Sequence, residues 1–267
     1  MAVAAAHREL QGPQPQPALS TGMMGMYIFL ASEVMFFGTL FAVYFYLHAS
    51  HVVWPPQFPQ GTGPVSFLGV TLVNTFILFS SGVTAHFGLE SLRHPDRHPI
   101  GALLLFLFFL ATVGSGIAAL FEKPFGTLLA VVAIVAQLVG ILAMLGIRPF
   151  ARVDGGYNRR AFVMLLVMTI VLGFLFEFGQ VYEFANAGFK FTSSEFTSAF
   201  FTMTGFHGGH VLGGLIILLL ILGRTLRGQF SPAHHVGVAA GTLYWHFVDL
   251  VWAFLYGVLY VGIALQL

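Results

Sequence analysis

Long apolar runs dominate this chain, and short stretches rich in polar residues, proline or glycine separate them. A transmembrane helix requires about 20 mostly apolar residues. Helices are expected because an open strand edge would leave backbone groups unsatisfied in lipid. The pattern predicts an all-α, polytopic membrane protein with seven transmembrane helices, at about residues 23–47, 65–88, 100–121, 125–147, 160–184, 197–222 and 236–265.

A short turn, FEKPFG at residues 121–126, divides the third predicted helix from the fourth. Glu122 and Lys123 make it polar, and Pro124 disfavours a continuous helix. Residues 1–21 contain PQPQP, which is typical of an extended and flexible segment. We therefore expect a flexible N-terminal segment at 1–21 and a single transmembrane helical domain at 22–267.

The distribution of basic residues predicts the orientation, because loops on the inner side of a membrane carry more Lys and Arg. With the N-terminus inside, the outer segments hold only Lys123 and Lys190. The inner segments then hold Arg8, Arg93, Arg97, Arg148, Arg152, Arg159, Arg160, Arg224 and Arg227. Seven spans place the C-terminus outside.

Composition supports a membrane protein. The chain is 57% hydrophobic and 8% charged, whereas soluble domains contain about 25% charged residues. The net charge of +1 provides no electrostatic basis for binding nucleic acid. The absence of cysteine excludes disulfides, iron–sulfur clusters and thiolate metal sites.

A few ionisable residues fall inside the predicted helices. Because such side chains are costly in contact with lipid, we expect them to face the bundle interior and to be paired or neutral. His246 and Asp249 are three residues apart, so they either bond to each other or bond to neighbouring helices. The set comprises Glu33, Glu177, Glu183, His207, His210, His246 and Asp249.

The stretch TGFHGGHV combines two of these histidines with glycines. A helical wheel places His207 and His210 on one side of the helix. It places Gly205, Gly209 and Gly213 on a separate seam that suits close helix packing. The histidines have two interpretations: a metal site completed by Glu33, Glu183, His246 or Asp249, or a hydrogen bond from an imidazole to Glu33 without metal.

Four stretches, in order along the chain, resemble subunit III of the haem–copper cytochrome c oxidases. They are LASEVMFF (30–37), VLGFLFEFGQVYEF (171–184), FFTMTGFHGGHV (200–211) and YWHFVDLVWAFLY (244–256), with a looser match at 74–92. The long form of that family carries its intramembrane glutamate on the third helix, whereas Glu33 is on the first predicted helix here. The resemblance therefore implies that the first two family helices are missing and that a pair at 100–147 is inserted.

The resemblance implies a non-catalytic subunit with no redox centre, metal or cofactor of its own, while haem and copper belong to partner subunits. Such a subunit packs mainly on subunit I, beside subunit II and other oxidase subunits, in a bacterial plasma membrane. It holds structural phospholipid, supports proton uptake and protects the catalytic subunit during turnover. The positions that match family elements, with lipid-related, proton-related or structural roles, are Glu33, Glu183, His207, His210, Trp245, His246, Asp249 and Trp252.

Three alternatives remain open on the sequence. The first is the related subunit of a quinol oxidase or of a nitric oxide reductase. The second is a proton- or metal-coupled transporter that uses Glu33, His207 and Asp249, which would be expected to show inverted repeats or broken helices. The third is an enzyme with an intramembrane metal.

Overall fold

The computed structural model describes residues 20–55, 70–93 and 159–265. Within these ranges, five helices are long and apolar enough to cross a membrane. They are α2 (Thr21–Ser50), α3 (Val70–Arg93), α6 (Arg159–Asn186), α7 (Glu195–Leu226) and α8 (Val236–Leu255), the last continued by a π-helix, η1 (Tyr256–Gly262). An all-α membrane protein is thereby confirmed. The predicted helices at 100–121 and 125–147, and nearly all of the N-terminal segment, lie outside the described residues.

The helix ends follow from local sequence. Ser20 caps α2 by accepting a hydrogen bond from the Met23 backbone N–H at 3.3 Å. Ser194 and Thr197 form a reciprocal capping box at the start of α7. At the other end of α7, the Arg159 guanidinium donates to the carbonyl oxygens of Thr225 and Leu226. These contacts extend the helices several residues beyond the apolar runs from which they were predicted.

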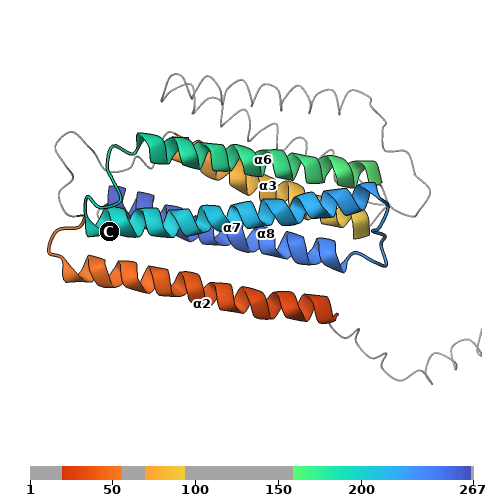
Figure 1. The fold of residues 1–267 in the computed structure, drawn as a ribbon, viewed down its shortest axis with the longest axis horizontal. Coiled ribbons are helices and arrows are strands. Elements are labelled where there is room, and N and C mark those ends of the chain that lie inside the picture. The colour runs from red at the N-terminus through yellow and green to blue at the C-terminus, as the bar shows by residue number, and fades with distance from the viewer. Residues whose placement is uncertain (1–19, 56–69, 94–158, 266–267) are drawn as a thin grey trace, which may run out of the picture.

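Four of the helices form the body of the bundle. Helix α3 packs on α6 and α8, and α7 packs on α6 and α8. Helix α2 lies along one side, next to α7 and α8 (Figure 1). Only Phe37 and Tyr44 are buried on α2, and many of its other apolar side chains are exposed. Helix α2 is therefore peripheral within the part of the chain that the structure describes.

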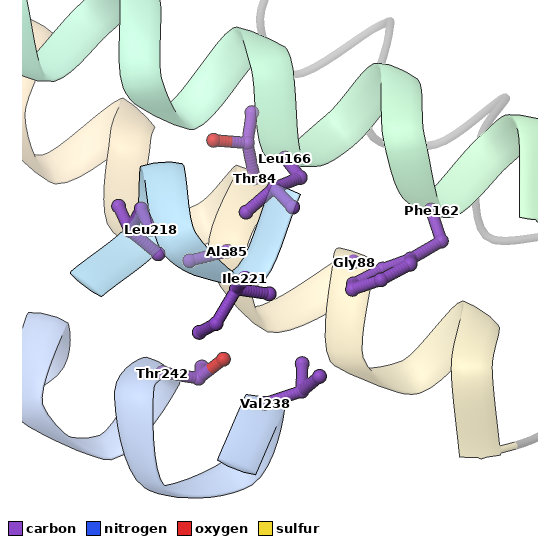
Figure 2. A pocket seen from close by; sticks show the side chains of 9 residues that line it. All are labelled: Thr84, Ala85, Gly88, Phe162, Leu166, Leu218, Ile221, Val238 and Thr242. Atoms are coloured by element: carbon purple, nitrogen blue, oxygen red, sulfur yellow. The ribbon is translucent and has the colours of Figure 1, made fainter. Parts of the chain in front are cut away.

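The core is densely filled by aromatic and aliphatic side chains, with the fully buried Trp245 and Trp252 of α8 at its centre. A small cavity of about 10 Å³ remains among α3, α6, α7 and α8 (Figure 2). That volume is at the lower limit for a single water molecule. Its two hydroxyl-bearing side chains are Thr84 and Thr242. The cavity is a packing defect too small for a ligand.

Candidate functional site within the transmembrane bundle

The ionisable residues at membrane depth are divided among several places in the bundle. Glu33 of α2 meets His210 of α7, with 2.9 Å between Oε2 and Nε2. The two side chains are only 16% and 20% accessible, respectively. The aromatic rings of Phe36 and Phe37 flank the imidazole at centroid distances of 5.9 and 4.9 Å. Of the two predicted histidines, His210 is therefore the one that Glu33 contacts.

The hydrogen bonds of His210 define how many protons this pair holds. Its Nδ1 lies 2.7 Å from the Phe206 carbonyl oxygen, and a carbonyl can only accept, so Nδ1 carries a proton. The second nitrogen faces the Glu33 carboxyl, and that contact requires one more proton, on either Nε2 or the carboxyl. In both cases the pair holds a shared proton and has zero net charge. A neutral pair is the arrangement that membrane depth favours.

His207 lies in different surroundings from His210. Its side chain is fully buried, and its ring stacks on Trp252 with centroids 5.0 Å apart. The ring edge of Phe176 packs beside it at 5.8 Å. Neither ring nitrogen has a hydrogen-bond partner among the described residues. The expectation that each deep ionisable group would be paired or neutral leaves only the neutral form for His207.

The two tryptophans of α8 tie this helix to α3. The indole N–H of Trp245 donates to the Ser81 hydroxyl at 2.9 Å, and that of Trp252 donates to the Thr75 hydroxyl at 3.0 Å. All four side chains are buried. Trp245 and Trp252 therefore have a structural role, bonding one helix to the next.

Polar side chains on α3 were missed by sequence reasoning. Besides its bonds to α8, helix α3 bonds α6 through Asn74, whose amide donates to the Phe176 carbonyl at 3.0 Å. The hydroxyls of Thr84 and Thr169 are 2.8 Å apart. The repeated Ser, Thr and Asn residues in residues 71–84 are the signal that could have identified this polar side of α3.

Glu183 lies near the end of α6 and is well satisfied. It accepts hydrogen bonds from the Thr71 hydroxyl at 2.8 Å and from the Gln180 amide at 3.0 Å. The Tyr260 hydroxyl makes no hydrogen bond of standard geometry, but it lies close enough to interact with the Glu183 carboxyl. This carboxyl joins α3, α6 and η1.

His246 and Asp249 are close, but they do not form a hydrogen bond. Nδ1 of His246 is 3.7 Å from Oδ2 of Asp249, and hydrogen bonds of this kind are about 2.7–3.2 Å long. Oδ2 rests against Gly82 of α3, where an added Cβ would collide with it. Oδ1 is buried without a hydrogen-bond partner among the described residues. The exposed His86 lies beside His246, with ring centroids 6.2 Å apart.

The predicted glycine seam is wrong for this part of the chain. At Gly205 and Gly209, no described atom lies within 4 Å of the position that a Cβ would occupy, and at Gly213 the closest atom is the Tyr244 hydroxyl oxygen at 3.4 Å. Close packing occurs at Gly173 and Gly214, where a Cβ would lie 2.8 Å from the Trp245 ring. The glycines that matter are therefore those that face the largest side chain in the core.

Glu177 lies at the boundary of α6 and α7. A Cβ on Gly208 would be 3.5 Å from its Oε1, and that oxygen is buried without a hydrogen-bond partner among the described residues. The small Gly208 leaves the space that this carboxyl occupies. The structure indicates no further role for Glu177.

The profile of the family "Cytochrome c oxidase subunit III" matches residues 5–127 and 150–263, which is most of the chain. The chain belongs to the cytochrome c oxidase subunit III family. The unmatched residues 128–149 include most of the fourth predicted helix, whereas the third falls inside the match. Of the pair that was expected to be inserted relative to the family, only the second therefore falls largely outside the family profile.

Curated relatives agree with this assignment. A cytochrome c oxidase subunit 3 from Thermostichus vulcanus is 28% identical over 240 residues, covering 90% of this chain and 86% of the relative. The protein of that name from Locusta migratoria is 31% identical, over 87% of this chain and 65% of its own length. The one from Gallus gallus is 30% identical, over 91% and 71%.

This family member brings no metal-binding cluster together within the residues described at 20–55, 70–93 and 159–265. The predicted ligand pool is dispersed: Glu33 pairs with His210, Asp249 lies against Gly82, and Glu183 bonds Thr71 and Gln180. As a subunit III family member, it has no redox centre of its own.

A second polar region lies at the end of the bundle that carries the C-terminus of α2. A pocket of about 210 Å³ is lined by Tyr44, His48, His51, Val52, Trp54, Gly262 and Ile263. The Trp54 indole donates to the Tyr44 hydroxyl at 3.2 Å. His51 points one nitrogen at the Leu47 carbonyl, at 2.9 Å, and the other at Glu195, at 3.4 Å. These contacts hold the end of α2 against the start of α7.

Proposed function

We propose that this chain is the non-catalytic subunit III of a proton-pumping haem–copper cytochrome c oxidase in aerobic respiration. The observation that supports this most strongly is the family match over most of the chain. The deep ionisable groups fit a supporting role, because Glu33, His210 and Glu183 are engaged in contacts between helices. In this proposal the chain packs mainly on subunit I, beside subunit II and other oxidase subunits, in a bacterial plasma membrane.

The neutral Glu33–His210 pair supports an indirect part in proton uptake. The pair keeps one shared proton between α2 and α7 without placing net charge in the bilayer. It can therefore stabilise the position of α2 over a range of proton activities near the uptake channel of subunit I. The chain itself forms no catalytic centre in this proposal.

The exposed side of α2 supports the binding of structural phospholipid. Ile28, Met35 and Val43 are 68%, 74% and 51% exposed, respectively, and apolar side chains of this kind suit acyl chains. Lipid held there would cover the least buried helix of the described bundle. We propose that this lipid and the chain together protect the catalytic subunit during turnover.

Purification of the tagged chain from its native membrane in mild detergent tests the function. The expected result is a complex that contains haem and copper, reduces oxygen with reduced cytochrome c as the electron donor, and carries bound phospholipid detectable by mass spectrometry. A complex that accepts electrons only from a quinol would instead identify a quinol oxidase subunit. Purification of the chain without any haem-bearing partner, together with substrate flux in liposomes of the chain alone, would identify a transporter.

A further inference from the structure

One lateral surface of the bundle combines polar and apolar exposed side chains. It is formed by α8 and the adjoining edge of α3, and we define it as the α8 surface, with the residues His86, His246, Asp249, Leu250 and Phe254. Leu250 and Phe254 are 55% and 58% exposed. His86 is exposed, and 39% of the His246 side chain is accessible. The Glu33–His210 pair is covered more completely, at 16% and 20%.

The polar residues of the α8 surface lie deep in the membrane. Asp249 is the central residue of the 27-residue span Val236–Gly262. At 1.5 Å per residue it is therefore about 20 Å from either end of the span. Its Oδ2 lies against Gly82 of α3, and His246 lies beside His86. None of these side chains is near enough to a helix end to reach the aqueous boundary easily.

Asp249 retains an unused hydrogen-bonding atom. Oδ1 is buried and has no partner among the described residues, and His246 is too distant from Oδ2 for a hydrogen bond. A buried acceptor without a donor is costly, particularly on a carboxyl group. The α8 surface is therefore incomplete without a donor from outside the described bundle.

The lateral surface of α6 provides the contrast. Its exposed side chains are all apolar, namely Val167, Val171, Phe174, Phe178 and Val181. Such a surface suits lipid, whereas ionisable residues at membrane depth face protein in most known cases. The two surfaces therefore have different neighbours in the membrane.

We propose that the α8 surface is the docking surface for a transmembrane helix of the catalytic oxidase subunit, and that this helix donates a hydrogen bond to Oδ1 of Asp249. Leu250 and Phe254 supply apolar contact around the polar centre, which is the usual composition of helix contacts in membranes. Gly82 assists by allowing the Asp249 carboxyl to lie against α3. The proposal rests on the proposed function, from which it takes the identity of the partner.

Site-specific photo-crosslinking within the intact complex tests this inference. Phe254→p-benzoylphenylalanine places the probe on the α8 surface, and Phe178→p-benzoylphenylalanine is the matched control on α6. The two phenylalanines are 58% and 56% exposed, and each lies eight residues before the end of its span. Adducts formed in native membranes are identified by mass spectrometry. The expected result is an adduct between position 254 and the catalytic subunit, and none with that subunit from position 178.

Three outcomes would overturn the docking surface. They are lipid adducts alone at position 254, an adduct from 254 to residues 94–158 of this same chain, or a catalytic-subunit adduct from 178 and none from 254. Each presupposes that the haem-bearing complex has been recovered. A failure to recover that complex with the unmodified chain would count against the proposed function instead.

A second variant tests the hydrogen bond itself. Asp249→Ala is expected to reduce retention of the chain by the complex about tenfold as detergent is increased, the effect of losing one interhelical hydrogen bond. The control is Thr202→Ala on α7, whose hydroxyl bonds only the carbonyl of Ser198 in its own helix. Equal retention of the Asp249→Ala chain and the unmodified chain would rule out the hydrogen bond to Asp249.

Discussion

Helices α2 and α8 are both long and apolar, yet they are held in the bundle in different ways. In the most apolar part of the span that includes α8, 61% of residues are buried, against 11% in α2. Helix α8 is bonded to α3 by two neutral indole N–H groups. Helix α2 is attached by one ionisable pair and by aromatic contacts along a narrow stripe. A helix in lipid can therefore be held by shape and neutral bonds or by one polar contact.

The physical reason lies in the solvent. Lipid tails are as apolar as leucine, so burying an apolar helix surface against another helix brings little hydrophobic gain. Close packing and hydrogen bonds must then supply the association. Helix α8 has both because Gly173 and Gly214 admit the Trp245 ring. The first prediction below removes that ring, and the later ones remove progressively smaller parts of the two attachments.

Trp245→Ala is expected to cause the largest loss of stability. Removing a fully buried ring leaves a cavity between α6, α7 and α8, with a cost of about 3–5 kcal/mol. Thermal unfolding of the purified chain in detergent micelles measures it. Trp245→Phe is the matched control, because it keeps an aromatic ring and loses the hydrogen bond to Ser81. Equal losses in the two variants would mean that the ring does not act by filling space.

Gly214→Ala is expected to have the next largest effect. The added methyl group would lie 2.8 Å from the Trp245 ring, and overpacking of this kind costs about 1–3 kcal/mol. Gly209→Ala on the same helix is the control, since no described atom lies within 4 Å of its Cβ position. Thermal unfolding should separate the two variants. If Gly209→Ala were the more damaging in the isolated chain, the importance assigned to Gly214 would be wrong.

The outcome for the glycines illustrates which parts of the site the sequence can predict. Their four-residue spacing correctly placed Gly205, Gly209 and Gly213 along one side of α7. The spacing does not reveal which neighbour faces that side, because this depends on where Trp245 projects from another helix. The spans were predictable for the opposite reason. Their lengths depend only on the thickness of the bilayer and on the apolar runs of the chain itself.

The histidines and the hydroxyl groups show the same limit. Glu33, His207 and His210 could be singled out because ionisable side chains are rare at membrane depth. Which histidine meets Glu33 depends on the position of α2, which the sequence pattern does not specify. Ser81 and Thr75 were overlooked because hydroxyls in helices commonly bond a carbonyl of their own helix. Only the packed bundle reveals that they also accept from tryptophan.

Thr75→Val tests the neutral attachment of α8 with little change in volume. It removes the hydroxyl that accepts from the Trp252 indole. Interhelical hydrogen bonds in membrane proteins average about 0.6 kcal/mol and reach about 1.7 kcal/mol. Thr202→Val is the control, because the Thr202 hydroxyl bonds only the Ser198 carbonyl in its own helix. Equal shifts in the unfolding temperature would show that the bond to Trp252 adds nothing to the stability of the bundle.

Glu33→Gln should have the smallest effect, and it tests the attachment of α2. The amide can accept from or donate to Nε2 of His210, so the contact between α2 and α7 is retained with zero net charge. Because the native pair is already neutral, we expect the complex to assemble in normal yield, with a stability change below about 1 kcal/mol. Glu33→Leu is the comparison, since it leaves the His210 nitrogen without this partner and should cost more. Recovery of the complex and its unfolding temperature measure both variants. Loss of assembly in Glu33→Gln would mean that α2 requires a charged carboxylate, and the neutral shared-proton pair would then be incorrect.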